Sequence, residues 1–336
     1  MKTLLDRLAD PRPMLYDGGF GAELFARGVQ LTNSTLANES HPHDVVEVHR
    51  AFINAGADAI GTNTFVASTL HLEMADKKDG EAEAILKLAV EHAHAAVEKS
   101  DRKVYIAGSI GPSPGAIEAD SGDTDFGIAN DRVREAHRRM AQILAEGGVD
   151  FFSIETMFSA NEAAIAVDEA RKTGLPIAVN MTYKFTKNRR TGEVVYRTDW
   201  GHSAADLLEI LSSGIFADGD DLLEHVHLLG LNCGAESQKV DHTGMPYALN
   251  GTQQLHEAMA QRGIAKKMMA YPNAGMPLLD ENHLTYYSQT PEEMVSLLPQ
   301  LLDQGAYFIG GCCGTTPAHI GAFRQAIDAH LEQKND

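Results

Sequence analysis

Cysteine and long apolar runs are both scarce in this chain. It has three cysteines in 336 residues, and no apolar run reaches the length of a membrane-spanning helix. An odd and small number of cysteines is a poor basis for a disulfide framework. A helix that crosses a bilayer needs about 18 or more apolar residues in succession. We therefore expect neither a disulfide-stapled domain nor a membrane protein.

Positive charge is also in short supply. Lysine and arginine total 28 against 47 aspartates and glutamates, which gives a formal net charge of −19. A surface this acidic repels phosphate backbones, so we do not expect nucleic acid as a partner. Charges at Asp6, Arg7 and Asp10 stand where a signal peptide needs its apolar stretch. These features favour a cytoplasmic protein.

Eight short β-rich runs alternate with amphipathic helical segments along the chain. The runs are 13–19, 57–65, 103–112, 149–157, 176–183, 225–234, 266–275 and 306–314. Several helical segments stop at a glycine just before the next run, as at Gly56, Gly148 and Gly305. This alternation predicts a (β/α)8 TIM barrel, with a doubly wound sheet as the alternative. We see no linker and expect a single domain over residues 1–336.

The ends of these runs carry polar and sulfur-bearing side chains. In a barrel, the C-terminal ends of the strands meet at one mouth, where active sites lie. The residues at these ends are Asp17, Gly18, Gly19, Thr62, Asn63, Thr64, Glu155, Thr156, Asn180, Asn232, Cys233, Asn273, Cys312 and Cys313. All three cysteines of the chain are therefore expected at the mouth.

Grouped cysteines in a reducing compartment point to a metal. Cys233 alone would most often be a buried, inert thiol, but the adjacent Cys312 and Cys313 lie between glycines and weaken that reading. Three thiolates make a zinc site with one open position, and soft sulfur favours zinc over magnesium or manganese. Zinc with three thiolates can hold a fourth thiol as thiolate at neutral pH, where a free thiol is mostly protonated. The chemistry this favours is alkyl transfer to a thiol substrate.

Six motifs of the chain resemble those of the homocysteine S-methyltransferase family. They are YDGGFGAEL, GADAIGTNTF, ETM, GLNCGA, YPNAG and GGCCGTTPAHI, and the resemblance runs from about residue 15 to residue 327. The family includes methyltransferases that use betaine or S-methylmethionine, and the homocysteine domain of cobalamin-dependent methionine synthase. The resemblance implies a zinc-bearing barrel that converts homocysteine to methionine.

The resemblance also implies roles for individual residues. Cys233, Cys312 and Cys313 match the zinc ligands, and Asp17 and Glu155 match the acids that hold the homocysteine amino group. The backbone amides of Gly18 and Gly19 are candidates for the homocysteine carboxylate. Asn63 and Asn273 are candidates either for substrate binding or for local hydrogen bonds within a turn. The side-chain oxygen of Asn273 is also a candidate ligand for the open zinc position.

The methyl donor is less determined by the sequence. A quaternary ammonium donor such as betaine needs an aromatic cage. The loop 29–44 has no aromatic residue, and Val66 stands where the betaine enzymes have a tyrosine. Tyr183, Phe185, Tyr196 and Trp200 form an alternative cage candidate. We expect a sulfonium or other small onium donor first, and a corrinoid protein acting in trans second, because no cobalamin or folate segment follows the eighth run.

Two further readings stay open. A non-catalytic zinc or thiol-binding sensor would use the same cysteines, whereas a zinc hydrolase usually takes histidine and carboxylate ligands. The basic run KFTKNRR, inside the long loop 182–206, is either a solvated loop or a contact with an anionic donor or partner. That loop and the loop 276–291 leave room for a homo-oligomer.

Overall fold

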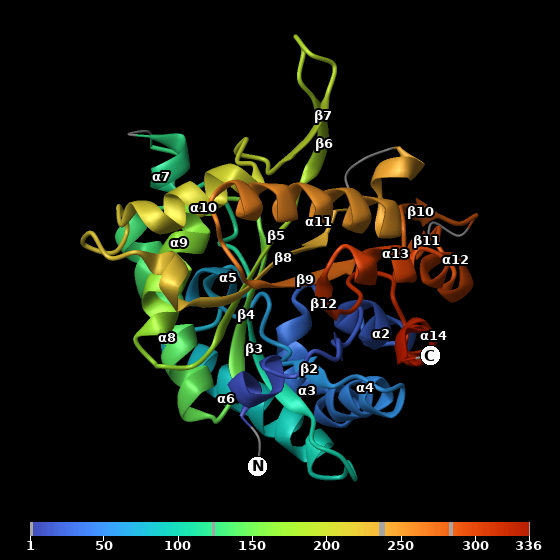
Figure 1. Ribbon diagram of the computed structural model, residues 1–336. Helices are drawn as coiled ribbons and strands as arrows, with labels where there is room; N and C mark the ends of the chain where they lie inside the picture. The colour runs from blue at the N-terminus through green and yellow to red at the C-terminus, as the bar shows by residue number, and fades with distance from the viewer. Residues whose placement is uncertain (1–2, 123–124, 235–238, 282–284, 336) are drawn as a thin grey trace.

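A parallel eight-stranded sheet forms the centre of the molecule (Figure 1). The computed structural model describes residues 3–122, 125–234, 239–281 and 285–335. Its strands follow the order β1-β12-β9-β8-β5-β4-β3-β2. Their bounds are β1 Met14–Leu15, β2 Ala59–Gly61, β3 Tyr105–Ile110, β4 Phe151–Met157, β5 Ile177–Met181, β8 Val226–Cys233, β9 Lys267–Pro272 and β12 Ala306–Ile309. Each of the eight predicted runs contains one of these strands.

Asp58 joins the two ends of the sheet. Its backbone N–H donates to the Leu15 carbonyl at 2.6 Å, and its carboxylate accepts the Leu15 N–H at 2.8 Å. Strands β1 and β2 are thus joined by one backbone and one side-chain hydrogen bond of Asp58 instead of a regular β-ladder. The sheet closes into a (β/α)8 barrel, which confirms the first predicted architecture over the doubly wound sheet.

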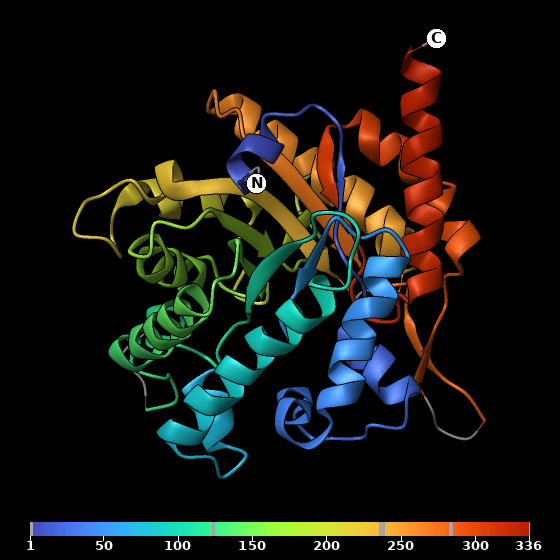
Figure 2. The same cartoon turned by 90° about the horizontal axis from the view of Figure 1, so that it is seen from below.

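Helices surround the barrel and cover the outer faces of its strands (Figure 2). The longer ones are α4 Pro42–Asn54, α6 Asp79–Val97, α8 Asn130–Glu146, α9 Ala160–Arg171, α10 Ala204–Ser213, α11 Gly244–Gln261 and α14 Pro317–Asn335. The shorter ones are α1 Leu4–Leu8, α2 Phe20–Ala26, α3 Ala37–Ser40, α5 Thr69–Glu73, α7 Glu118–Ser121, α12 Pro291–Val295 and α13 Leu298–Asp303. The 3-10 turns are η1 Ser34–Leu36, η2 Leu222–His225 and η3 Val240–His242. None of the helices in the described part of the chain combines the length and apolar character needed to cross a membrane.

Two layers make up most of the apolar core, and a small third cluster contains Ile117, Val133 and Ile165. The larger one lies between the strands and the helices and includes Phe52 and Leu144. The smaller one fills the barrel itself, where Phe151 and Phe308 pack together with the buried leucines of α1. Each such side chain stabilises the fold by about 1.5–3 kcal/mol relative to exposure. The packed interior of the barrel supports the strand ends, so the residues at the mouth are held by a rigid core.

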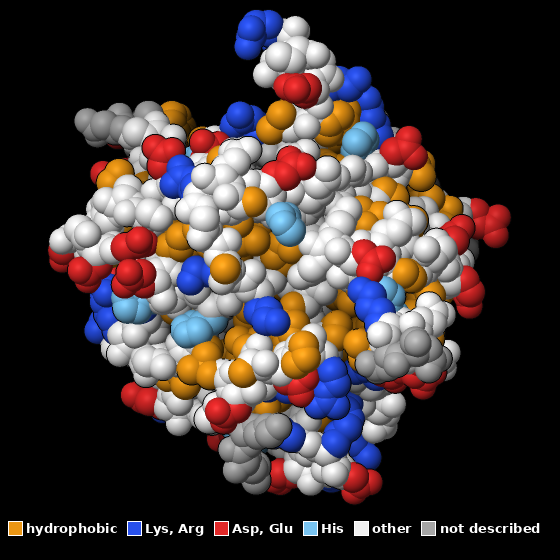
Figure 3. Space-filling model, in the orientation of Figure 1, with side chains coloured by type: hydrophobic (Ala, Val, Ile, Leu, Met, Phe, Trp, Pro, Cys, Tyr) orange, Lys and Arg blue, Asp and Glu red, His pale blue; other side chains and the backbone are white. Residues whose placement is uncertain are grey.

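The two long loops after β5 and β9 both contain a small antiparallel hairpin. Strands β6 Lys184–Lys187 and β7 Val194–Arg197 form the first, and β10 Pro277–Leu279 and β11 Thr285–Tyr287 form the second. The β6–β7 hairpin projects from the barrel and carries basic side chains at its tip (Figures 1 and 3). The sequence predicted these segments as loops on the mouth side, and the hairpins add structure to that prediction.

His49 of α4 is an unusual member of the core. It is fully buried against Phe20, with a ring separation of 4.7 Å, and neither ring nitrogen has a hydrogen-bond partner among the described residues. Burial, and then the neighbouring His92, lower the pKa of His49 from 6.5 to about 3. The folded protein therefore keeps a neutral ring that the unfolded chain protonates below about pH 6.5.

This depressed pKa predicts an acid-sensitive fold. Below pH 6.5, His49 takes up a proton in the unfolded state but not in the folded state. The free energy of unfolding therefore falls by about 1.4 kcal/mol per pH unit. Between pH 8 and pH 5 the free energy of unfolding should fall by about 2 kcal/mol less in the His49→Leu variant than in the wild type. Urea unfolding at the two pH values measures this. His43→Leu, at an exposed position of the same helix, is the control, and equal pH dependence in both variants would contradict the assignment.

Candidate metal and substrate site

The three cysteines meet at the mouth of the barrel, as the sequence predicted. Their sulfur atoms all lie within 4.8 Å of one another, and those of Cys312 and Cys313 are 4.0 Å apart. A tetrahedral ion with metal–sulfur bonds of about 2.3 Å spaces its sulfurs by about 3.8 Å. The cluster is thus close to the spacing that a metal requires.

The backbone around Cys233 is held in a conformation that few side chains adopt. Cys233 has φ +59° and Gly234 follows with φ +77°. A Cβ at Gly234 would lie 2.2 Å from the Tyr247 ring. A left-handed residue other than glycine costs on the order of 1–3 kcal/mol and is typical of functional sites. This turn at the end of β8 directs the Cys233 sulfur toward the pair after β12.

Asn232 ties the Cys233 turn to the neighbouring strand β4. Its Oδ1 accepts the Thr156 N–H at 2.8 Å, and its Nδ2 donates to the Thr156 hydroxyl at 2.6 Å. Thr156 is itself left-handed, with φ +56°. The same Asn232 nitrogen lies 3.8 Å from the Cys312 sulfur. One buried amide therefore positions the ends of two strands and contacts the cluster; the sequence placed it at the mouth without a role.

The thiols do not ionise independently. Hydrogen bonds with Cys233 and Cys313 raise the pKa of Cys312, whereas hydrogen bonds from Cys233 and Cys312 lower the pKa of Cys313. By itself the cluster favours one thiolate. A divalent cation reverses this preference because it deprotonates each thiol that it binds. The donor set therefore fits a soft metal ion.

Two carboxylates face the same cavity as the cysteines. The cavity has a volume of about 260 Å³ and is lined by Asp17, Glu155 and the three cysteines, together with Gly18, Gly19 and Asn63. The Ser109 hydroxyl donates to one oxygen of Glu155, and the Tyr271 hydroxyl donates to the other at 3.0 Å. The predicted site residues thus share one cavity, and Ser109 and Tyr271 are contacts that the sequence did not indicate.

Burial disfavours the charged form of both carboxylates. It raises the pKa of Glu155 from 4.5 to about 7, against the hydrogen bonds from Ser109 and Tyr271. Burial also raises the pKa of Asp17 well above its usual range, although the Gly61 N–H donates to it at 2.8 Å, and the Glu155 charge raises it further. No lysine, arginine or histidine lines this cavity in the described part of the chain. Two such acids without a cation are a ready site for a ligand ammonium group.

The remaining predicted residues are engaged by the protein itself. The Gly19 N–H donates to the carbonyl and hydroxyl of Thr315, both at 3.0 Å. The Asn63 amide donates to the Ser34 carbonyl at 2.9 Å. The oxygen of Asn273 accepts the Cys313 N–H at 3.0 Å. In this arrangement these residues shape the mouth and hold the cysteine loop.

The alternative aromatic cage is not brought to the cavity. Tyr183 and Tyr196 are buried elsewhere, and Tyr196 packs edge-on against Tyr247 at 5.5 Å. The Phe185 ring is covered by Lys239 at 4.4 Å, and Trp200 is 41% exposed. The aromatic residues that do line the cavity are Tyr16, Phe20, Phe65 and Tyr271.

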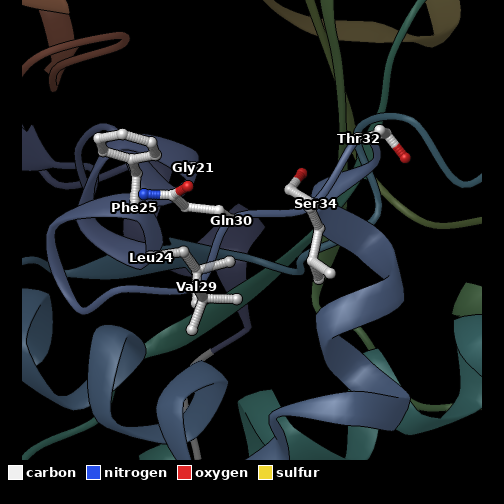
Figure 4. Close-up of a pocket in the computed structure, with 8 residues that line it drawn as sticks. Gly21, Leu24, Phe25, Val29, Gln30, Thr32 and Ser34 are labelled. Carbon is white, nitrogen blue, oxygen red and sulfur yellow. The ribbon is translucent and has the colours of Figure 1, made fainter. Parts of the chain in front are cut away.

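A second cavity adjoins the first across the loop after β1 (Figure 4). It has a volume of about 340 Å³ and shares Gly21 and Ser34 with the site cavity. Leu24, Phe25 and Val29 line one side, and Thr32 and Ser34 line the other (Figure 4). The segment after β1 therefore borders both cavities, with Asp17 lining the first and Leu24, Phe25 and Val29 lining the second.

Comparison with known proteins places these features in context. The family model for homocysteine S-methyltransferase matches residues 14–327. Methionine synthase of Mycobacterium tuberculosis is 28% identical over 341 residues, which cover 96% of this chain and 25% of that protein. Homocysteine S-methyltransferase 3 of Arabidopsis thaliana is 26% identical and covers 93% of this chain and 88% of that protein. The chain spans about a quarter of the methionine synthases that it matches.

The fold also has a solved counterpart. The metallated form of the homocysteine methyltransferase MmuM from Escherichia coli superposes with a TM-score of 0.69. The match covers 96% of this chain and 98% of that one at 23% identity. At this level of identity the likeness establishes the barrel and its connectivity.

Proposed function

Because the chain belongs to the homocysteine S-methyltransferase family, we propose that it binds zinc through Cys233, Cys312 and Cys313 and methylates the homocysteine thiol to give methionine. The observation that carries this proposal is the convergence of three sulfurs, the buried Asp17 carboxylate and the partly buried Glu155 carboxylate on one cavity. Homocysteine carries a thiol and an ammonium group on one short chain. The cavity offers a partner for each.

Zinc suits three cysteine ligands, and when bound it keeps the substrate thiol deprotonated at neutral pH. The remaining work falls to the side chains. Asp17 and Glu155 are the proposed partners of the ammonium group, and the backbone at Gly18 and Gly19 is the proposed contact for the substrate carboxylate. Their buried position excludes water and fixes the sulfur for in-line attack on the donor methyl group. The sulfur–methyl bond forms as the donor's bond to methyl breaks, and the donor leaves with the electron pair.

For the donor, we propose a small sulfonium or other onium compound. Phe20 and Phe65 are among the residues that line the cavity, and an onium methyl group is attracted to aromatic rings. The second candidate is a corrinoid protein acting in trans. What favours it is the similarity of this chain to about a quarter of the methionine synthase of Mycobacterium tuberculosis, at 28% identity over 341 residues.

A panel of methyl donors tests the reaction and separates the candidates. Zinc-loaded, reduced protein is incubated with homocysteine and one donor at a time, and methionine is followed by mass spectrometry. The donors are betaine, S-methylmethionine, S-adenosylmethionine, dimethylsulfoniopropionate, methyltetrahydrofolate and a methylated corrinoid. We expect methionine from one small onium donor. Methionine from the corrinoid alone selects the second candidate, and a metal-loaded protein that methylates homocysteine with none of them contradicts the proposal in favour of a sensor.

A further inference from the structure

Two hydroxyl groups hold the Glu155 carboxylate from different strands. Ser109 of β3 donates to its Oε1, and Tyr271 of β9 donates to its Oε2 at 3.0 Å. In the order of the sheet, β3 is a neighbour of β4, which carries Glu155, whereas β9 lies three strands away from β4. The Tyr271 side chain therefore reaches Glu155 across the interior of the barrel.

The Tyr271 ring is fixed by its surroundings. It is 1% exposed and belongs to the apolar layer inside the barrel. The Tyr16 ring packs edge-on against it, with the ring centroids 5.4 Å apart. A buried ring with such a neighbour has few alternative positions. Packing therefore sets the place of the Tyr271 hydroxyl on the wall of the site cavity.

A second hydroxyl lies behind that of Tyr271. The Ser153 oxygen is 3.2 Å from the Tyr271 oxygen, and the Asn180 side-chain amide donates to Ser153 at 3.4 Å. Ser153 and Asn180 are fully buried. Ser153 precedes Glu155 by two residues on β4, so the two side chains lie on the same face of the strand. These groups form a buried row that ends at the Glu155 carboxylate.

The hydrogen bonds of this row run in one direction. An ionised carboxylate accepts hydrogen bonds and donates none, so the single proton of the Tyr271 hydroxyl points to Glu155. The Tyr271 oxygen then accepts from Ser153, whose own oxygen accepts from the Asn180 amide. Every donor is thus directed toward the carboxylate. Because buried hydrogen bonds polarise one another, the row strengthens the last bond to Glu155.

The two hydroxyls leave part of the Glu155 carboxylate free for a ligand. A carboxylate has about four lone-pair positions, and the bonds from Ser109 and Tyr271 occupy only some of them. Among the described residues, no lysine, arginine or histidine lines the cavity to occupy the rest. A ligand ammonium group can therefore bind a carboxylate whose orientation the protein has already set.

We propose that Tyr271 is a positioning residue for recognition of the substrate amino group, and that its hydroxyl, supported by Ser153, orients the Glu155 carboxylate toward the ligand ammonium. This inference rests on the proposed function. A charge-assisted hydrogen bond depends on geometry, so a carboxylate that is free to rotate binds the ammonium less well. Tyr271 should thus affect discrimination between ligands with and without an amino group, and not the binding of the thiol.

Tyr271→Phe tests this because it removes the hydroxyl and keeps the ring beside Tyr16. The ligands are homocysteine and 4-mercaptobutanoate, which has the same thiol and carboxylate but no amino group. Calorimetry with the zinc form measures both dissociation constants, and their ratio is the selectivity for the amino group. We expect Tyr271→Phe to lower this selectivity about tenfold and to change the affinity for 4-mercaptobutanoate by less than about twofold. Tyr183→Phe is the control, because it removes a buried hydroxyl that has no hydrogen-bond partner among the described residues and does not line the cavity.

Ser153→Ala is a second test that leaves the tyrosine intact. It should lower the selectivity about threefold, since Tyr271 keeps its bond to Glu155 but loses the support of the row. The double variant should resemble Tyr271→Phe alone, because Ser153 acts through Tyr271, whereas independent effects would multiply. A loosened barrel interior would instead weaken both ligands alike and leave the selectivity unchanged.

The outcomes separate this inference from the proposed function. If the wild type prefers homocysteine and the selectivity is the same in Tyr271→Phe and Tyr183→Phe, the inference is overturned and the proposed function stands. Equal affinity of the wild type for the two ligands would also overturn the inference, because no acid would then recognise the amino group. If the zinc-loaded wild type binds neither ligand, the proposed function fails and the inference fails with it. If Tyr271→Phe does not fold, Ser153→Ala decides: a lowered selectivity supports the inference, and an unchanged one overturns it.

Discussion

Replacing Cys312 by alanine is expected to remove the metal and to lower kcat/KM for methionine formation by about 1,000-fold or more. Loss of an outer-shell partner alone typically costs about 10–100-fold in metal affinity or activity, and Cys312 is a proposed direct ligand. Its sulfur lies 4.0 Å from that of Cys313 and within 4.8 Å of that of Cys233. Two sulfurs at this spacing do not replace a three-ligand site.

The fold should survive this substitution. The Cys312 N–H donates to the Pro272 carbonyl at 2.8 Å, and this bond does not depend on the side chain. The side chain lines the cavity and is only partly buried where it packs against the core inside the barrel, so its loss should cost about 1 kcal/mol. Metal content by mass spectrometry, activity and thermal unfolding are measured together, with metal-free wild type as the control. A variant that kept both zinc and activity would contradict the three-ligand scheme.

The sequence predicted the barrel and the cysteine cluster for the same physical reason. Buried parallel strands are short apolar runs, and glycines such as Gly56 and Gly148, with φ +108° and +87°, end the helices before them. In a closed barrel, position along each strand alone decides which residues reach the mouth. Cys233 and Cys312 therefore could be placed together although 79 residues separate them.

The contacts that tune the site could not be predicted in this way. The Tyr287 ring lies beside Gly314, the residue after Cys313, because that glycine leaves room for it. The hairpin that carries Tyr287 has only three residues in each strand. Runs this short show no clear alternation. The environment of Glu155 depends on hydroxyls from β3 and β9. Such contacts depend on side-chain directions across strands, which sequence spacing does not specify.

Replacing Glu155 by glutamine is expected to stabilise the substrate-free protein and to weaken homocysteine binding about 100-fold. Burial raises the pKa of Glu155 from 4.5 to about 7. As pH rises above 4.5, the unfolded chain releases this proton first, so ionisation of Glu155 destabilises the fold progressively up to about pH 7 and by a constant amount above it. Glutamine has no charge to desolvate and can still accept the Tyr271 hydrogen bond.

The two effects have opposite signs and different pH dependence. At pH 8 the variant should be more stable than wild type by about 2 kcal/mol, a value reduced for the partial exposure of Glu155 to the cavity, and at pH 4 the two should be equal. Removing one partner of a buried charge pair costs about 2–5 kcal/mol of binding, and the expected 100-fold loss corresponds to about 2.8 kcal/mol, within that range. Urea unfolding and calorimetry measure the two quantities.

Glu146→Gln is the control, because it removes the same charge from an exposed helix end and should change neither quantity. Wild-type affinity for homocysteine should itself fall as pH drops below about 7, since the substrate ammonium requires the ionised acid. If the Glu155→Gln variant bound homocysteine with normal affinity, Glu155 would not be a partner of the substrate ammonium group. A variant that lost binding and also lost stability at pH 8 would mean that Glu155 is ionised and paired in the free protein. Weaker binding together with a more stable fold is the pattern expected of a residue that destabilises the free protein but is needed to bind the ligand.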